Sequence, residues 1–324
     1  MRYITKRLGL FLVTLWAALT INFLLPRVMP GNEAEAVFSQ LRNANPATLR
    51  ALEVEFGVNL HQNILLTYFQ YLGNCFTGQF GLTVDRVPVM TKILTGLPWT
   101  LGLVGVATVV SFGLGTLLGV VAAWRRGGKL DSILPPLLFI VTAFPVFFLG
   151  LLLLLIFAVS LGWFPTTGNY SIGGTPSLSP GFIADVLSHA FLPALTLVLT
   201  LAGTWVYTMR NNMVTTLSED YVRMARAKGL APWRIMLDYS ARNAILPNLT
   251  GFAMQMGFVL GGAILVEYTF SYPGVGYLFF TATETHDLPL MEALFLLFTV
   301  AVLICVLFAD FATALLDPRT REAG

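Results

Sequence analysis

The sequence predicts an all-α polytopic membrane protein with six transmembrane helices. Three observations support this class. First, 56% of the 324 residues are hydrophobic and only 11% are charged, whereas a soluble globular domain carries about 25% charged residues. Second, several apolar runs reach the length that crosses a bilayer as a helix, about 20 residues. Third, Lys and Arg are concentrated in alternate polar segments between these runs, as in a multi-span protein.

The apolar runs set the expected spans. Trp99 and Trp124 bracket the second run and Trp163 closes the third, and Trp is typical of the membrane interface. Pro135, Pro136 and Pro145 predict a kinked third span, and such kinks occur both in transport paths and in purely structural bundles. The six runs lie near residues 8–28, 99–124, 134–161, 190–212, 250–271 and 289–315.

The first run also has features of a signal peptide. Arg2 and Lys6 precede its apolar stretch, and Ala34-x-Ala36 follows it like a cleavage site. The apolar stretch is longer than a usual signal core, so we expect an uncleaved span.

Orientation follows from the basic residues. With the N-terminus inside, most of the 19 Lys and Arg residues fall on the cytoplasmic side. Six spans then place both termini in the cytoplasm of a bacterial or archaeal cell, as expected for a multi-pass protein of its plasma membrane. The formal net charge of +2 is too small to indicate a nucleic-acid partner, whereas membrane lipid is an obligatory one.

The polar segments divide the chain. We expect residues 1–98 to form the first span and an external region, with a helix over Pro46–Phe56. Residues 99–318 should form a five-helix core. This core would contain a second external loop at 162–189 and one large cytoplasmic loop at 213–248, which we call the elbow. Glycines spaced four apart at 115 and 119, and again at 257 and 261, predict close helix approach in lipid.

The elbow predicts two helices joined by a turn. Ser218 is a plausible N-cap for the first helix, and Gly229 is a natural stop. The second helix would begin at Pro232, which suits a first turn, and run to about Ile245 before Pro247 breaks it. A short helix tied to two spans could dock on a protein partner. Its basic residues also suit a helix lying on anionic lipid, so both alternatives stay open.

Two acidic residues lie within expected spans. Glu267 could contact a substrate amine or a gate partner, or it could be a paired structural acid, which we favour. For Asp310 we expect a structural pairing, with Arg210 at similar depth. The scattered histidines and the two cysteines, Cys75 and Cys305, show no metal-ligand spacing, so we expect no metal site.

The motif Ala225-x-x-x-Gly229 followed by Ile245-Leu246-Pro247 resembles the "EAA" loop of binding-protein-dependent ABC importer permeases. Arg223 and Met224 replace the Glu and first Ala of the generic loop, and the stretch before Leu-Pro is longer. Both departures resemble the dipeptide, oligopeptide and nickel permease branch. Further similarity to its "B"-type permease follows the chain in order: Arg2-Tyr3-Ile4, Pro30-Gly31, Gly78-x-Phe80-Gly81, His189-x-x-Leu192-Pro193, Val266-Glu267-x-x-Phe270-x-x-Pro273-Gly274 and Leu316-Asp317-Pro318-Arg319.

This resemblance implies a type I ABC importer permease fold and a set of partners. These are a second homologous permease, two cytoplasmic ATPase subunits and an extracellular substrate-binding protein that delivers the cargo. The chain would be a non-catalytic subunit that binds no cofactor, with ATP and Mg held by the ATPases; it contains no Gly-x-x-x-x-Gly-Lys-Ser/Thr loop. The implied ATPase-coupling residues are Arg223, Ala225, Arg226, Ala227, Lys228, Gly229, Leu230, Ala231, Pro232 and Trp233.

Substrate and competing classes remain to be separated. Peptides are the first expectation from the branch, oligosaccharides the second, and nickel is less favoured. A secondary transporter would show inverted repeats and several midplane ionisable groups, and an intramembrane enzyme would show a catalytic motif such as His-Glu-x-x-His. We find neither signal. A passive channel is disfavoured by the elbow, and a requirement of uptake for ATP would exclude it.

Overall fold

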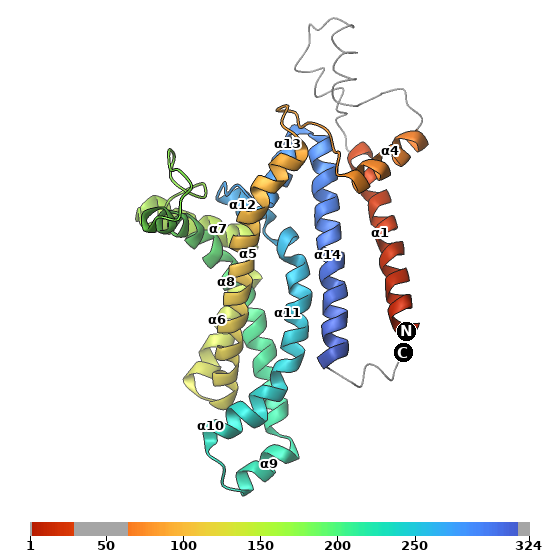
Figure 1. Cartoon of the computed structure of the whole chain (residues 1–324). Coiled ribbons are helices and arrows are strands. Elements are labelled where there is room, and N and C mark those ends of the chain that lie inside the picture. Colours follow the sequence, from red (N-terminus) through yellow and green to blue (C-terminus); the bar gives the residue numbers. More distant parts are fainter. Residues whose placement is uncertain (1, 29–63, 317–324) are drawn as a thin grey trace, which may run out of the picture. The chain divides into compact units, whose positions relative to one another are not determined.

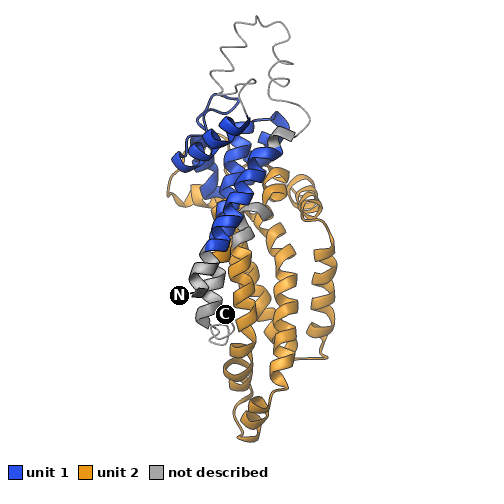
Figure 2. Cartoon of the chain, turned by 90° about the vertical axis from the view of Figure 1, so that its right-hand side faces the viewer, with its two compact units in different colours: residues 1–99, 273–304 blue, residues 100–272, 305–324 orange. Residues whose placement is uncertain are grey.

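The computed structural model describes residues 2–28 and 64–316 of the chain, with side chains over 9–25, 64–256 and 263–307. The helix expected over 46–56 lies outside these residues. The chain separates into two compact units, residues 1–99 with 273–304 and residues 100–272 with 305–324 (Figure 2). The first unit combines segments from distant parts of the chain, whereas the expected division into 1–98 and 99–318 follows chain order and stays a prediction.

Unit 1 is helical in its described part. Leu19 and Phe23 on α1 (Arg2–Val28) pack against Tyr71 on α4 (Ile64–Thr77). The Thr20 hydroxyl on α1 lies 2.8 Å from the Tyr68 hydroxyl on α4. Asn22 donates to Thr299 at 3.2 Å, which ties the first helix to the last. The helices are α1 Arg2–Val28, α4 Ile64–Thr77, α13 Val275–Thr285 and the starts of α5 Val89–Trp124 and α14 Leu288–Leu316 (Figure 1).

Unit 2 contains most of the bundle and the elbow. After the remainder of α5, its helices in chain order are α6 Lys129–Ala143, α7 Val146–Leu153, the π-helix η1 Leu154–Ser160, α8 Pro180–Leu217, α9 Asp220–Ala227, α10 Pro232–Arg234, the π-helix η2 Ile235–Ala241, α11 Arg242–Gly262 and α12 Ile264–Thr269 (Figure 1). Helix α8 is the central element, because α6, α7, α11 and α12 all contact it.

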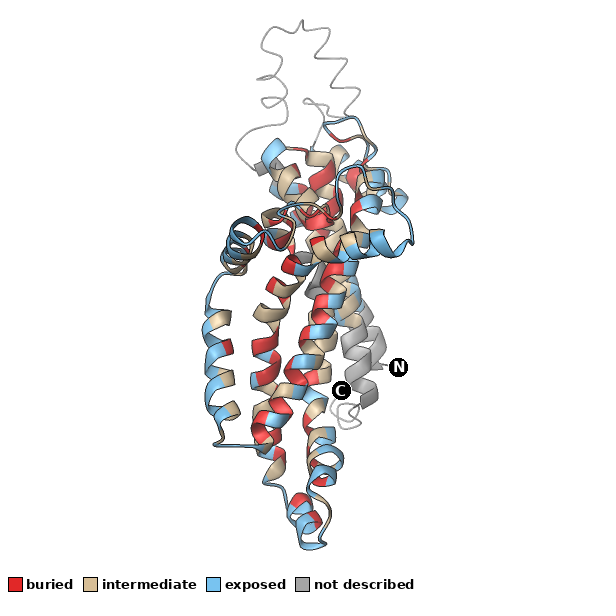
Figure 3. Ribbon diagram, turned by 90° about the vertical axis from the view of Figure 1, so that its left-hand side faces the viewer, coloured by how far each residue is buried: buried red, intermediate tan, exposed pale blue. Residues whose placement is uncertain are grey.

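Three helices of the described chain are long and apolar enough to cross a membrane: Val89–Trp124, Pro180–Leu217 and Leu288–Leu307. A fourth span exists if the bent pair Lys129–Ala143 and Val146–Ser160 is one span. Large apolar side chains on these helices, such as Phe139 and Leu117, are exposed. Exposed residues recur along the ribbons of the helices (Figure 3). Lipid is the solvent that such a surface requires.

Two expected spans are interrupted. The third is bent by 101° between its halves, because Phe144 before Pro145 adopts the extended conformation that a following proline favours. The fifth is divided into α11 and α12 at Ala263. The predicted kink of the third span is therefore confirmed, at Pro145, whereas a single continuous helix is wrong for the fifth run.

Close packing of α5 on α8 depends on two glycines. A Cβ at Gly115 would lie 2.5 Å from Trp205 Cβ, and one at Gly119 would lie 2.8 Å from the Val206 carbonyl oxygen and from Met209 Cβ. The predicted close approach is confirmed for this pair. The glycines at 257 and 261 lie outside the described side chains.

Candidate functional site

The first elbow helix begins one residue later than its predicted cap implies. Glu219 is the N-cap of α9, and Ser218 instead ends α8, with its hydroxyl donating to the Thr215 carbonyl at 2.6 Å. The prediction that Ser218 caps α9 is wrong because α8 extends through Leu217. Asp220 lies in the first turn, where a carboxylate favours the positive end of a helix.

Gly229 ends α9 as predicted. Its φ of +74° is in the left-handed region, which glycine reaches without the steric cost of a Cβ. Its N–H donates to the Arg226 carbonyl at 3.0 Å, and the N–H of Leu230 donates to the Ala225 carbonyl at 3.3 Å. These two bonds form a Schellman motif, which satisfies carbonyls at the helix end and turns the chain sharply.

The elbow has a small hydrophobic core of its own. Val222 and Ala225 on α9 are buried against Ile235 on η2, and Leu230 and Tyr239 pack at the edge of this cluster. Ala225 therefore packs inward, and so does half-buried Leu230. The predicted role of Leu230 as an ATPase-coupling residue stays a prediction. This core makes α9 and η2 one rigid piece rather than two independent segments.

The elbow also exposes apolar and basic side chains. Tyr221, Met224 and Trp233 are exposed large side chains, and the Arg234 guanidinium lies 5.3 Å from the Trp233 ring centroid. Sequence reasoning missed Tyr221 and Met224, although their spacing of three residues places them on one helix face. The remaining predicted residues on this surface are exposed or, for Ala231, half-buried: Arg223, Arg226, Ala227, Lys228, Gly229, Ala231 and Pro232.

The elbow continues into the bundle without a break. Pro247 lies inside α11, so the prediction that it breaks the second helix is wrong. The Asn212 side chain on α8 donates to the Ala244 carbonyl at 3.2 Å. Asn243 donates to the Tyr221 hydroxyl at 3.1 Å and links the base of α11 to α9.

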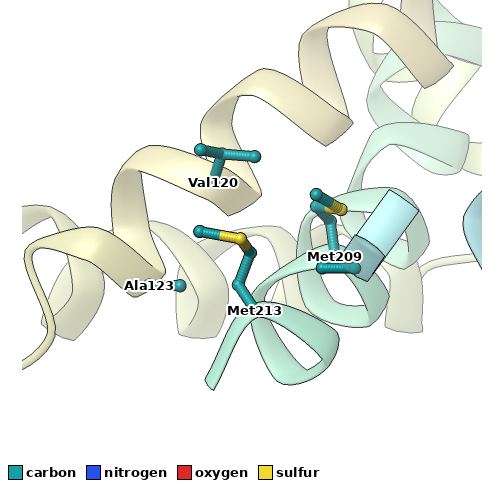
Figure 4. Packing of buried hydrophobic residues seen from close by; sticks show 5 residues of the cluster. Val120, Ala123, Met209 and Met213 are labelled. Atoms are coloured by element: carbon teal, nitrogen blue, oxygen red, sulfur yellow. The ribbon is translucent and has the colours of Figure 1, made fainter. Parts of the chain in front are cut away.

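A hydrophobic cluster lies where the elbow joins the bundle. Met209 and Met213 on α8 are fully buried against Val120 and Ala123 on α5, and Ala244 on α11 completes the cluster. Figure 4 shows Met213 reaching toward the helix that carries Val120 and Ala123. Because protein interiors are densely packed and transmit displacement, movement of the elbow would be passed directly to α5 and α8.

Arg210 forms an ion pair with Asp131. Its guanidinium donates through Nη2 to Asp131 Oδ2 at 3.1 Å and through Nε to Asp131 Oδ1. Asp131 lies in the first turn of α6, which packs along α8. The expected partner Asp310 lies outside the described side chains. A bidentate ion pair of this kind fixes the orientation of both side chains.

Glu267 is fully buried on α12 and accepts a hydrogen bond from the Thr100 hydroxyl at 2.6 Å. A buried carboxylate that is held by a neighbouring helix is typical of a structural acid, the interpretation favoured from the sequence. Its role in a substrate path or gate stays a prediction.

A second buried acid lies in unit 1. Asp287 accepts from the backbone N–H of Leu290 at 3.2 Å as a cap of α14, and from the N–H of Val84 at 3.0 Å. Burial raises the pKa of this carboxyl above its usual range, and the two backbone hydrogen bonds partly oppose the shift. The contact fixes the 82–88 turn to the start of α14.

In the described part of the chain, no three His, Cys, Asp or Glu side chains gather as metal ligands would. The arrangement offers a rigid, exposed helical elbow and a membrane bundle. The expectation that ATP and Mg are held by partner subunits stays a prediction.

Known proteins resemble the chain over nearly its whole length. An oligopeptide transport system permease protein, AppB, of Bacillus subtilis is 33% identical over 98% of this chain and 98% of its own length. A di/tripeptide transport system permease protein, DppB, of Pseudomonas aeruginosa is 32% identical over 99% and 98%. A glutathione transport system permease protein, GsiC, of Escherichia coli is 33% identical over 99% of each chain.

The fold and the family agree with these similarities. A chain of the MetNI methionine ABC transporter in an inward-facing conformation superposes with a TM-score of 0.57 at 16% identity, covering 70% of this chain and 97% of the solved chain. At that identity the likeness concerns the fold alone. A family model described as "Binding-protein-dependent transport system inner membrane component" matches residues 115–322. The chain belongs to the family of binding-protein-dependent transport system inner membrane components.

Proposed function

We propose that this chain is one permease subunit of an ATP-driven importer of peptides. The observation that carries the proposal is similarity along the whole chain to permeases of oligopeptide, di/tripeptide and glutathione transport systems. Glutathione is itself a peptide, so these relatives support peptides over oligosaccharides or nickel. The complete subunit would cross the bacterial plasma membrane six times, with both termini in the cytoplasm.

The proposed partners follow from the family. A second homologous permease would complete the translocation path, two ATPase subunits would bind from the cytoplasm, and an extracellular binding protein would deliver the peptide. The exposed surface of the elbow supports the ATPase contact. Exposed aromatic, Met and Arg side chains are the kinds of residue that are enriched at protein interfaces. An acidic groove on the partner would complement the basic residues.

The packing suggests how a motor could move the spans. The elbow core around Val222 and Ile235 holds α9 and η2 together, and η2 continues directly into α11. A push on α9 would therefore reach α11 through a helix and α8 through the cluster around Met213. Alternating access to the two sides of the membrane would follow from that movement.

Reconstitution tests this function. The chain is purified from its native membranes with whatever ATPase subunits and binding protein accompany it, and the assembly is placed in proteoliposomes. We expect uptake of radiolabelled peptides that requires both the binding protein and ATP. The control is the same assembly with a partner ATPase that binds but does not hydrolyse ATP. Uptake of an oligosaccharide or of nickel instead of peptide would overturn the substrate, and uptake without ATP would overturn the importer.

A further inference from the structure

One long stretch of unit 2 carries no charged side chain. From Ser132 to Ala184 the sequence contains no Asp, Glu, Lys, Arg or His. The stretch includes the loop 161–179, which connects η1 to α8. The loop contains Ser, Thr, Asn and Tyr, so it is polar but uncharged, and its apolar residues lie among these. Large exposed apolar patches mark contact with a membrane or another protein.

This loop is held in a defined conformation. The N–H of Gly168 donates to the Phe270 carbonyl at the end of α12 at 3.1 Å. The backbone N–H and the hydroxyl of Ser171 both donate to Asp185 on α8, each at 2.7 Å. The ring of Phe164 stacks on that of Phe191, with centroids 4.7 Å apart. The loop is therefore anchored to α8 and α12 at several points.

The anchored loop presents apolar side chains outward. Ile172 and Leu178 are essentially fully exposed, at 107% and 93%, and Trp163 is exposed at 65%. The bonds made by Ser171 fix the backbone next to Ile172, so this side chain is not free to fold back on its own helices. In water these side chains would leave a large apolar area uncovered.

The exposed surface is continuous along the chain with a surface suited to lipid. Helix η1, which leads into the loop, exposes Leu155, Ile156 and Val159. Trp163 follows at once, in the position that amphipathic aromatic residues take at a membrane interface. A soluble binding protein that docks reversibly is usually guided by complementary charge, and this stretch offers none.

We propose that the loop 161–179 is seated in the outer lipid leaflet, with Ile172 and Leu178 inserted at the boundary between headgroups and acyl chains. The inference rests on the proposed topology, which places this loop outside the cytoplasm. The loop would act as an interfacial anchor for α8, because Asp185 connects the inserted loop to the start of that helix.

Spin labels measure the proposed insertion directly. Cys75→Ser and Cys305→Ala remove the native thiols, and a single nitroxide is attached at Ile172→Cys or Leu178→Cys in the assembled transporter in proteoliposomes. Collisions with oxygen, which is concentrated in lipid, are compared with collisions with a water-soluble nickel chelate. Val159→Cys serves as the lipid-facing reference, and Arg126→Cys, an exposed position in the turn between α5 and α6 outside the elbow, serves as the aqueous one.

The proposal predicts that both loop labels collide less often with the nickel chelate than a label at position 126 does, and collide with oxygen as often as a label at position 159. Nickel access equal to that at position 126 would overturn it, since the loop would then lie in water. Exclusion of both reagents would also overturn it, since protein would cover the loop. Peptide uptake by the same vesicles tests the proposed function separately.

A charged variant tests whether insertion of the side chain at position 172 causes the low access of the nickel chelate to the loop. With the label at position 178, Ile172→Asp should raise nickel access, because an inserted carboxylate is expelled from an apolar environment. Ile172→Leu should leave access unchanged. An equal response to both variants would contradict insertion through the side chain at 172.

Discussion

Gly229 is the position where the elbow can be altered on its outer surface without disturbing its core. Its φ is +74°, and a Cβ added there would meet nothing within 4 Å. The Cβ of Gly229→Leu therefore meets no other atom of the chain, and the left-handed backbone adds a strain of about 1–2 kcal/mol. That cost is small beside a typical stability of about 5–15 kcal/mol, so the subunit should still fold and assemble.

The added side chain projects from the surface that we propose to contact an ATPase. If close contact at this point contributes about 1.4 kcal/mol or more, its loss should reduce coupling at least about tenfold. The assay measures ATP hydrolysis and peptide uptake in the same proteoliposomes. We expect hydrolysis to continue while uptake per ATP falls.

A matched control separates strain from contact. Gly127 has a φ of +80° and also has no atom within 4 Å of an added Cβ, but it lies in the turn between α5 and α6, outside the elbow. Gly127→Leu carries the same backbone strain and should leave coupling unchanged. Equal loss in both variants, or normal uptake by Gly229→Leu, would refute the reasoning.

Three further predictions concern the fold. Gly119→Leu should destabilise the fold by an overpacking cost of about 1–3 kcal/mol and so lower the temperature of the thermal transition in detergent. Gly113→Leu is the control, because a Cβ at Gly113 meets nothing within 4 Å. Equal transition temperatures for the two variants would contradict close packing of α5 on α8 at Gly119. Asp287→Ala removes a cap of α14 worth about 1 kcal/mol, so amide exchange at Leu290 should accelerate; unchanged exchange would exclude the cap. Val222→Ala should cost about 1.5 kcal/mol of buried apolar contact and loosen the elbow; protease resistance equal to that of the native chain would count against its core.

The sequence was sufficient for features that depend on one residue type or on composition. The helix end at Gly229 was predicted because few other residues readily adopt the left-handed conformation that ends a helix. Close packing of helices at Gly115 and Gly119 was predicted because glycine has no side chain. The family resemblance was carried by the elbow motif and by matches along the whole chain, and the comparisons confirm it. Composition alone indicated a membrane bundle.

Features that depend on distant packing were not predictable in the same way. The partner of Arg210 is Asp131, which lies far away in sequence and meets it only because α6 packs along α8. Helix α8 continues to Leu217 and Ser218 is its C-cap, so the residue-type rule that made Ser218 an N-cap failed. Pro247 is accommodated inside α11, so the presence of a proline alone did not mark the end of this helix.

Photo-crosslinking from the elbow tests the central claim most directly. Benzoylphenylalanine replaces Trp233 on the exposed elbow surface or, as a matched control, Phe139 on the outward face of α6; both native side chains are exposed aromatics. The assembled transporter is irradiated in native membranes and the adducts are identified by mass spectrometry. We predict an ATPase subunit on position 233 and lipid on position 139. Lipid adducts alone at position 233 would contradict the account, because the elbow would then lie on the membrane surface rather than on a motor.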